Sequence, residues 1–214
     1  PAQALPFQER LREMFLDPAQ PVETRTIARH QNVYTCGDQD LMIYFIERGQ
    51  VKLLMLSPAG KECLLDIHTA GDLFGELCLI GSGERMETAT TMTDALLKGI
   101  HCSQFNRRLQ SEPLRAALTE HLLARLARQQ QVIANLLTGD SQARLAVTLL
   151  ELARKFGQPD PASVRIELHV SQEELSQMVG TTRPRISEFM RRFQKLGLIE
   201  IKPRRCILVK AKAL

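Results

Sequence analysis

The chain has 214 residues, 44% of them hydrophobic and 24% charged, a globular composition that excludes a disordered or membrane-embedded chain. No apolar run approaches the ~20 residues of a membrane helix, and the first residues lack a signal peptide's apolar core, so we expect a cytoplasmic protein without a membrane partner. The net charge of +4 is uneven, because residues 139–214 hold 14 Lys and Arg against 8 Asp and Glu, whereas residues 1–138 hold 14 against 16, so the last third suits a polyanion.

The first half of the chain has the pattern of an all-β domain. A short amphipathic helix is expected over residues 5–16. From Val22 to about Phe105, short runs of Val, Ile, Leu, Tyr and Thr alternate with glycine-containing turns. The expected strands are 24–29, 41–47, 50–56, 61–67 and 88–100. Small β-barrels and jelly rolls have this rhythm, so we predict one of them here.

Cysteine and histidine are spread thinly through the chain. The five cysteines include no C-x-x-C pair and are expected to be small buried hydrophobes in a reducing compartment. A redox sensor that uses Cys78 or Cys102 is the alternative. The five histidines show no H-x-H or H-x-x-x-H spacing, so the sequence gives little support to a metalloenzyme. We therefore expect no metal site and no catalytic site.

Residues 111–137 predict one long helix, with Pro113 in its first turn. An apolar stripe at i, i+4 spacing runs along it, made of Leu114, Leu118, Leu122 and Leu126 and continued by Ile133 with Leu136 or Leu137. Such a stripe can cover the β-domain or pack against a second copy of the helix. The glutamines at 129–131 interrupt the stripe, and Gly139-Asp140 is expected to end the helix and act as a hinge.

The C-terminal part predicts a helix over 142–156, an exposed loop over 157–163 and a strand over 164–169. Two short helices follow within residues 171–198. The first begins with a capping box, Ser171 with Glu174 three residues later. Gly180 permits the positive φ of a tight turn, Thr182 can cap the second helix, and Pro184 fits its first turn. Residues 199–201 and 206–209 predict a β-hairpin wing.

The second short helix has an apolar side and a polar, largely basic side. The apolar stripe, expected to be buried, contains Ile186, Phe189, Met190, Phe193 and Leu196. The opposite side carries Pro184, Glu188, Arg191 and Lys195, flanked by Arg185 and Arg192. This arrangement is what a helix-turn-helix needs to read DNA. The alternative is an ordinary helical hairpin with a solvated charged face.

Two blocks carry a resemblance to a known family. The segment YTCGDQDLMIYFIERGQVKLLMLSPAGKECLLDIHTAGDLFGELCLI resembles a cyclic-nucleotide-binding β-roll. With ELSQMVGTTRPRIS near the other end, the chain from about Phe7 to Val209 resembles the CRP/FNR family of bacterial transcription regulators. The resemblance implies an α+β protein that is not an enzyme. Its parts would be a β-roll (jelly roll) sensor domain over 1–110, a dimerisation helix over 111–138 and a winged helix-turn-helix DNA-binding domain over 139–214.

The resemblance also implies an effector site, since residues 75–90 occupy the place of the family's phosphate-binding cassette. That chemistry needs backbone N–H groups at a short helix, a carboxylate for a ribose hydroxyl and an arginine for the phosphate. The implied effector residues are Gly75, Glu76, Leu77, Cys78, Arg85, Met86, Gln129 and Gln130. The effector would be cAMP or another small molecule, although Met86 and Glu87 replace the usual small residues. The alternative is an effector-independent regulator, in which Glu76 and Arg85 pair with each other and the β-roll is a dimer scaffold.

The implied partners are a second copy of the chain, double-stranded DNA with a palindromic operator, and RNA polymerase through the loop at 157–163, which could equally be an inert connection. The implied DNA-binding residues are Ser171, Gln172, Thr181, Thr182, Arg183, Pro184, Arg185, Ser187, Glu188, Arg191, Lys202 and Arg204. Arg183 matches a family position that commonly reads guanine. Pro184 and Glu188 depart from the family archetype, which has a glutamate and an arginine there. The preferred half-site should therefore differ from the archetype's TGTGA.

Overall fold

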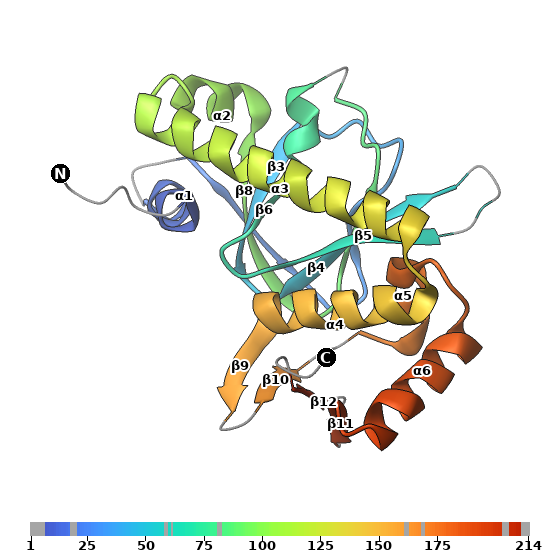
Figure 1. The fold of residues 1–214 in the computed structure, drawn as a ribbon. Helices are drawn as coiled ribbons and strands as arrows, with labels where there is room; N and C mark the ends of the chain where they lie inside the picture. Colours follow the sequence, from blue (N-terminus) through green and yellow to red (C-terminus); the bar gives the residue numbers. More distant parts are fainter. Residues whose placement is uncertain are drawn as a thin grey trace. The chain divides into compact units, whose positions relative to one another are not determined.

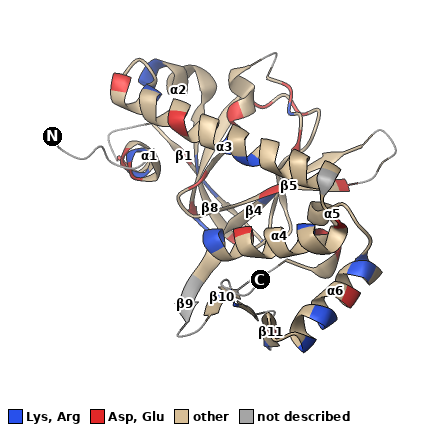
Figure 2. Cartoon of the chain, viewed as in Figure 1, with Lys and Arg blue, Asp and Glu red and all other residues tan. Residues whose placement is uncertain are grey.

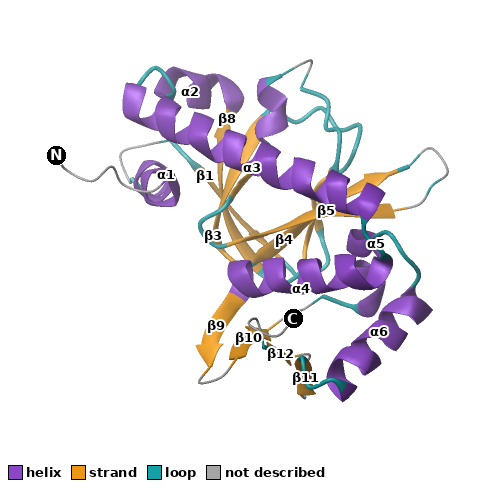
Figure 3. Ribbon diagram, viewed as in Figure 1, coloured by secondary structure: helices purple, strands orange, loops and turns teal. Residues whose placement is uncertain are grey.

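The computed structural model describes residues 7–17, 21–57, 60, 62–80, 83–160, 163–167, 170–202 and 206–210. The chain forms two compact units, Pro1–Ala127 and Arg128–Leu214. Most strands lie in the first unit, while three helices and a small sheet make up most of the second (Figure 3). The long helix α3, Glu112–Thr138, runs through the boundary between the two units (Figure 1).

The first unit is built on two four-stranded antiparallel sheets, with strand orders β1-β8-β3-β6 and β2-β7-β4-β5. The strands are β1 Glu23–Ile27, β2 Asn32–Tyr34, β3 Met42–Arg48, β4 Gln50–Leu56, β5 Glu62–Thr69, β6 Leu73–Phe74, β7 Thr88–Thr91 and β8 Ala95–His101. This is the predicted β-roll. The two shortest strands, β2 and β6, were not predicted, because two or three residues carry no readable periodicity.

The single strand predicted over 88–100 is wrong. The chain bends at residues 92–94, so β7 pairs with β4 and β2 while β8 pairs with β1 and β3 in the other sheet. Tertiary contacts make the bend: the Met92 amide donates to the Gln50 carbonyl at 2.8 Å, and the Gln50 amide donates to the Thr93 hydroxyl at 3.0 Å. Gly49 allows this approach, because a Cβ there would lie 2.6 Å from the Asp94 carbonyl oxygen.

Two apolar clusters hold the first unit together. One lies on strands of both sheets and is centred on the rings of Tyr34, Tyr44 and Phe74. The other joins strands β3, β6 and β8 to three helices: α1 (Phe7–Leu16), α2 (Cys102–Arg108) and the first half of α3. The predicted first helix is confirmed from Phe7 onward, and residues 5–6 lie outside the described residues.

On α3, the predicted apolar stripe divides into two parts. Leu118 is buried in the second cluster and Leu114 is half-buried, so this end packs on the first unit. Leu122 and Leu126 are exposed, and so are the apolar residues of the last turns. The part of the stripe that follows Leu118 is therefore free to pack against another surface.

The second unit is a winged helix-turn-helix. Its elements are α4 Ser141–Phe156, β9 Gly157–Asp160, β10 Ser163–Glu167, α5 Gln172–Val179, α6 Arg183–Lys195, β11 Ile199–Lys202 and β12 Cys206–Val209. The strands form one antiparallel sheet in the order β11-β12-β10-β9. The exposed loop predicted over 157–163 is wrong at its start, because 157–160 pair with β10 as a hairpin. A Cβ on Gly157 would lie 2.1 Å from both the Ala153 carbonyl oxygen and Val164, so this strand needs its glycine.

The predicted capping box at the start of α5 is confirmed. The Glu174 amide donates to the Ser171 hydroxyl at 3.2 Å, and the Ser171 amide donates to the Glu174 carboxylate at 2.8 Å. Thr182 is the N-cap residue of α6, as predicted, but its side chain makes no capping hydrogen bond.

This difference predicts the stability of two matched variants. We expect Ser171→Ala to lower the free energy of unfolding by about 1 kcal/mol, because an amide of the first turn of α5 loses its partner. Thr182→Ala should change it by only a few tenths of a kcal/mol, since no capping bond is lost. Urea unfolding of both variants measures the difference, and equal losses would contradict the assignment.

Candidate DNA-binding and effector sites

The first candidate site is the exposed side of α6, which follows α5 after a tight turn. Gly180 makes the turn with φ 67°, as predicted. Ile186, Met190 and Phe193 are 0–3% exposed and fix the helix to its unit. Phe189 is half-buried and Leu196 is 61% exposed, so the buried stripe is narrower than predicted and ends before the last turn.

The predicted DNA-binding residues that the structure describes are all exposed or half-buried. Lys and Arg lie on both sides of the single acidic residue of α6, Glu188 (Figure 2). The exposed members are Thr182, Arg183, Pro184, Arg185, Glu188, Arg191 and Lys202, and the half-buried members are Ser171, Gln172, Thr181 and Ser187. The predicted Arg204 lies outside the described residues.

Two contacts fix the orientation of α6. The Ser187 hydroxyl donates to the Gln172 side chain, which ties the start of α5 to the middle of α6. Arg192 donates to the Gln142 side chain at 2.9 Å, which ties α6 to α4. The first turn of α6 therefore presents its side chains from a fixed backbone, as sequence recognition by base contacts needs.

The second candidate site surrounds Arg85, which is 3% exposed and lies beside the short helix η1, Glu76–Leu79. Its guanidinium donates to the Gly75 carbonyl at 2.8 Å and to the Met42 carbonyl, and one of its nitrogens lies 3.0 Å from an Asp40 carboxylate oxygen. It also lies 3.9 Å from the centre of the Tyr34 ring.

Glu76, the other charged residue of the predicted cassette, pairs with Arg125 of α3. The expected pairing of Glu76 with Arg85 is therefore wrong. Both residues are charged and largely buried, and each has an opposite charge of its own. Asp40 and Arg125 are not among the predicted effector residues. The signal for Arg125 was its position seven residues after Leu118, two turns along the packed face of α3.

Glu87 is a buried carboxyl group in the same region. It is 4% exposed and accepts a hydrogen bond from the Tyr34 hydroxyl at 3.0 Å. Burial raises the pKa of Glu87 above its ordinary value, with the nearby Glu76 adding to the effect and the Tyr34 hydrogen bond opposing it.

The remaining predicted effector residues are spread over different environments. Leu77 is half-buried, Met86 is 59% exposed, and Cys78 is buried, where burial raises the pKa of its thiol to about 12. Gln129 and Gln130 are exposed on α3, in the second unit. The described residues include no group of three or more His, Cys, Asp or Glu that could hold a metal ion. In the part of the chain that the structure describes, no helix is long and apolar enough to cross a membrane.

A direct pH test follows from the position of Glu87. Because its folded-state pKa is raised, the folded state binds this proton more tightly than the unfolded state does, and that stability is lost as pH rises through the folded pKa. Glu87→Gln keeps an acceptor for Tyr34 but removes the charge.

We therefore expect the variant to melt a few degrees above wild type at pH 8, with the gap closing toward pH 4. Melting curves of both proteins from pH 4 to 8 measure it. A constant gap over this range would contradict the assignment.

Comparisons with known proteins cover both candidate sites. Residues 24–112 match the cyclic nucleotide-binding domain family, and residues 143–214 match the Crp-like helix-turn-helix domain family. A CRP-like cAMP-activated global transcriptional regulator of Mycobacterium tuberculosis is 31% identical over 85% of this chain and 80% of its own. The transcriptional regulator LdrP of Thermus thermophilus is 31% identical over 89% of this chain and 94% of its own. A solved transcriptional regulator of the CRP family, also from Thermus thermophilus, is 30% identical, with a TM-score of 0.71 over 88% of this chain and 93% of that one.

Proposed function

The chain belongs to the CRP/FNR family of DNA-binding transcription regulators, and from this premise we propose that it acts as a homodimer on a palindromic operator. The exposed side of α6 carries the proposal, because its polar side chains project from a helix fixed on its opposite side. Binding to an operator agrees with the cytoplasmic location that the sequence predicts.

The exposed apolar residues of α3 support the dimer. Leu123, Leu126, Ile133 and Leu137 are between 51% and 82% exposed. With Gln130 they follow the alternating three- and four-residue steps of a coiled-coil seam. Exposing a seam of leucine and isoleucine to water costs free energy, and pairing two copies of α3 would bury this apolar surface.

The side chains at the start of α6 support a specific half-site. Arg183 can donate both of its forked N–H groups to the O6 and N7 of guanine, and Glu188 can accept from the N4 amino group of cytosine. Pro184 has no polar side chain to offer a base. We propose that this set reads a half-site other than TGTGA.

Selection from random duplexes tests this proposal. We expect an inverted repeat whose half-sites lie about one helical turn apart. Recovery of TGTGA half-sites would contradict the specificity, and recovery of single half-sites would contradict the dimer. The double variant Pro184→Glu with Glu188→Arg restores the archetype's residues at both positions. Its preferred half-site should move toward TGTGA.

For the β-roll we propose control by a small anionic effector at η1 and Arg85. Gly75 has φ 81°, precedes η1 and accepts a hydrogen bond from Arg85, so a guanidinium, which can pair with an anion, lies at the start of this short helix. The printed name of the Mycobacterium tuberculosis relative, cAMP-activated, supports a cyclic nucleotide.

The competing function is that of an effector-independent regulator. It is favoured by the ion pairs Arg85–Asp40 and Glu76–Arg125, since an anion would have to take Arg85 from Asp40. Calorimetry with cAMP and cGMP, together with operator binding with and without each nucleotide, separates the two. Heat of binding and a change in operator affinity support the effector, whereas no heat at millimolar nucleotide and unchanged affinity support the scaffold.

The cysteine-based redox alternative rests on two free cysteines, Cys78, which is buried, and Cys102, which is half-buried. It is the least supported of the three, because the raised pKa of Cys78 keeps that thiol protonated and poorly nucleophilic. Peroxide should leave operator binding unchanged. A peroxide effect that is lost in the double alanine variant at these positions would favour the redox account.

We also propose that RNA polymerase contacts the β9–β10 hairpin, which stands where the predicted loop was expected. Arg165→Ala, at an exposed position of β10, should then lower activation of transcription and leave operator affinity unchanged. Unchanged activation would favour an inert connection.

A further inference from the structure

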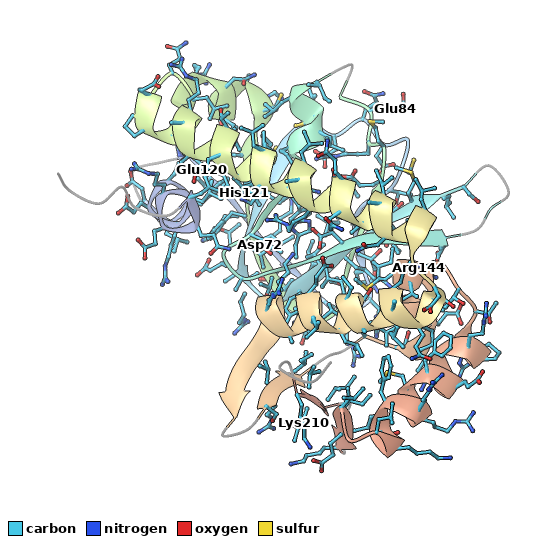
Figure 4. The ribbon with its side chains drawn as sticks, in the orientation of Figure 1. Asp72, Glu84, Glu120, His121, Arg144 and Lys210 are labelled. Atoms are coloured by element: carbon cyan, nitrogen blue, oxygen red, sulfur yellow. The ribbon has the colours of Figure 1, made fainter. Side chains whose placement is uncertain are left out.

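Arg144, in the first turn of α4, connects three parts of the second unit (Figure 4). Its Nη1 donates to the Gly139 carbonyl at 2.7 Å, at the end of α3. Its Nε donates to the Val179 carbonyl at 2.8 Å, and its Nη2 donates to the Gly180 carbonyl at 3.3 Å, at the end of α5 and the turn before α6. One guanidinium therefore joins the long helix to the turn of the helix-turn-helix.

The chemistry of this contact favours arginine. The last carbonyls of a helix have no partner within the helix and form the negative end of its dipole. Arg144 places one positive charge at the C-terminal ends of α3 and α5 together. Its planar fork can serve three acceptors at once, whereas a lysine ammonium is a point donor on a flexible stem.

Two further contacts lie at this junction. A Cβ built on Gly180 would lie 3.2 Å from Leu136 Cδ2, so the last turns of α3 lie against the turn of the helix-turn-helix. The Asp140 side chain accepts from the Ala143 amide at 2.7 Å and caps α4. Arg144 thus bridges the Gly139-Asp140 step, which the sequence predicts to be a hinge.

We propose that Arg144 is a positioning residue that fixes each DNA-reading helix pair to the end of its own long helix. In the dimer, the two long helices then set the separation between the two reading helices. This inference rests on the proposed function, because separation has a meaning only for a homodimer on a palindrome. It assigns to Arg144 the choice of operator spacing rather than the choice of bases.

The test measures binding of the full-length protein to three kinds of duplex: the selected palindrome, the same palindrome with one to three base pairs inserted or removed at its centre, and a single half-site. Wild type should prefer one separation by about tenfold or more. Arg144→Gln should lose about tenfold on the preferred palindrome, bind the half-site within about twofold of wild type, and show a flattened spacing profile. Arg144→Lys should restore part of the spacing preference. Arg154→Gln, the same change at an exposed position of α4, should behave as wild type.

Each contrary outcome is distinct. If Arg144→Gln keeps the wild-type spacing profile, the inference is overturned. If it loses half-site and palindrome binding equally, Arg144 only supports the fold of the reading unit, and the inference is again overturned. If wild type itself shows no preferred separation, the proposed dimer on a palindrome fails first and the inference fails with it.

Discussion

Replacing Leu126 and Ile133 together with glutamate is expected to produce a monomer that binds the palindromic operator about 100-fold more weakly than wild type. Both side chains are more than half exposed on α3 and lie seven residues apart in the proposed seam. Each glutamate would face its own copy across a two-fold axis, where the two like charges repel each other. Pairing would also remove water from both carboxylates, and the apolar contact of the original side chains would be lost. The loss arises because the second half-site is no longer bound by a linked partner.

Sedimentation velocity and a gel-shift titration measure the two effects. A matched control is Ala124→Glu with Gln131→Glu, which adds the same two charges, seven residues apart, on another exposed line of the same helix. The control should remain dimeric and bind the operator within a few-fold of wild type. A dimeric seam variant, or a control that also dissociates, would place the dimer contact elsewhere.

Arg183→Ala is expected to have the largest effect on sequence recognition. A bidentate contact to guanine contributes about 1–3 kcal/mol of discrimination, and a palindrome contains two such contacts, so the operator should lose about 2–6 kcal/mol of specific binding energy. Binding to unrelated duplexes should change much less. The variant should accept any base at the position that wild type restricts to guanine.

Competition titrations with single-base operator variants measure this prediction. Lys195→Ala removes the same charge from the other end of α6 and serves as the control. The loss of DNA affinity in Lys195→Ala should be small and equal for all sequences. A shallower dependence of affinity on salt concentration would identify the lost contact as one to phosphate. If Arg183→Ala weakens binding equally on all duplexes, Arg183 contacts phosphate and another residue reads the guanine.

The helix-turn-helix could be predicted almost residue by residue, because its signals are local. The capping box at Ser171, the glycine at position 180 and the proline in the first turn of α6 each act within one turn of backbone. The split of residues 88–100 into two strands could not be predicted. It depends on hydrogen bonds to Gln50, which is distant in sequence, and a run of threonine and leucine reads as extended in either case.

The candidate effector site shows the same limit. Gly75, Glu76 and Arg85 could be proposed from the resemblance to the family, but their partners could not. Asp40 and Arg125 reach the site from other elements, and neither belongs to a local motif. The pairing decides the electrostatics of the site, so the sequence alone left open whether Arg85 already has a counter-ion.

Gln130 has a consequence for a cell that contains several related regulators. A polar side chain at one position of an apolar seam lowers the stability of the pair, but it penalises every register and every partner that would set leucine against the amide. Subunits of a relative with an apolar residue there would therefore be poor substitutes for a second copy of this chain. In the proposed seam, the exposed amide of Gln130 would thus disfavour mixed dimers with mismatched DNA specificities.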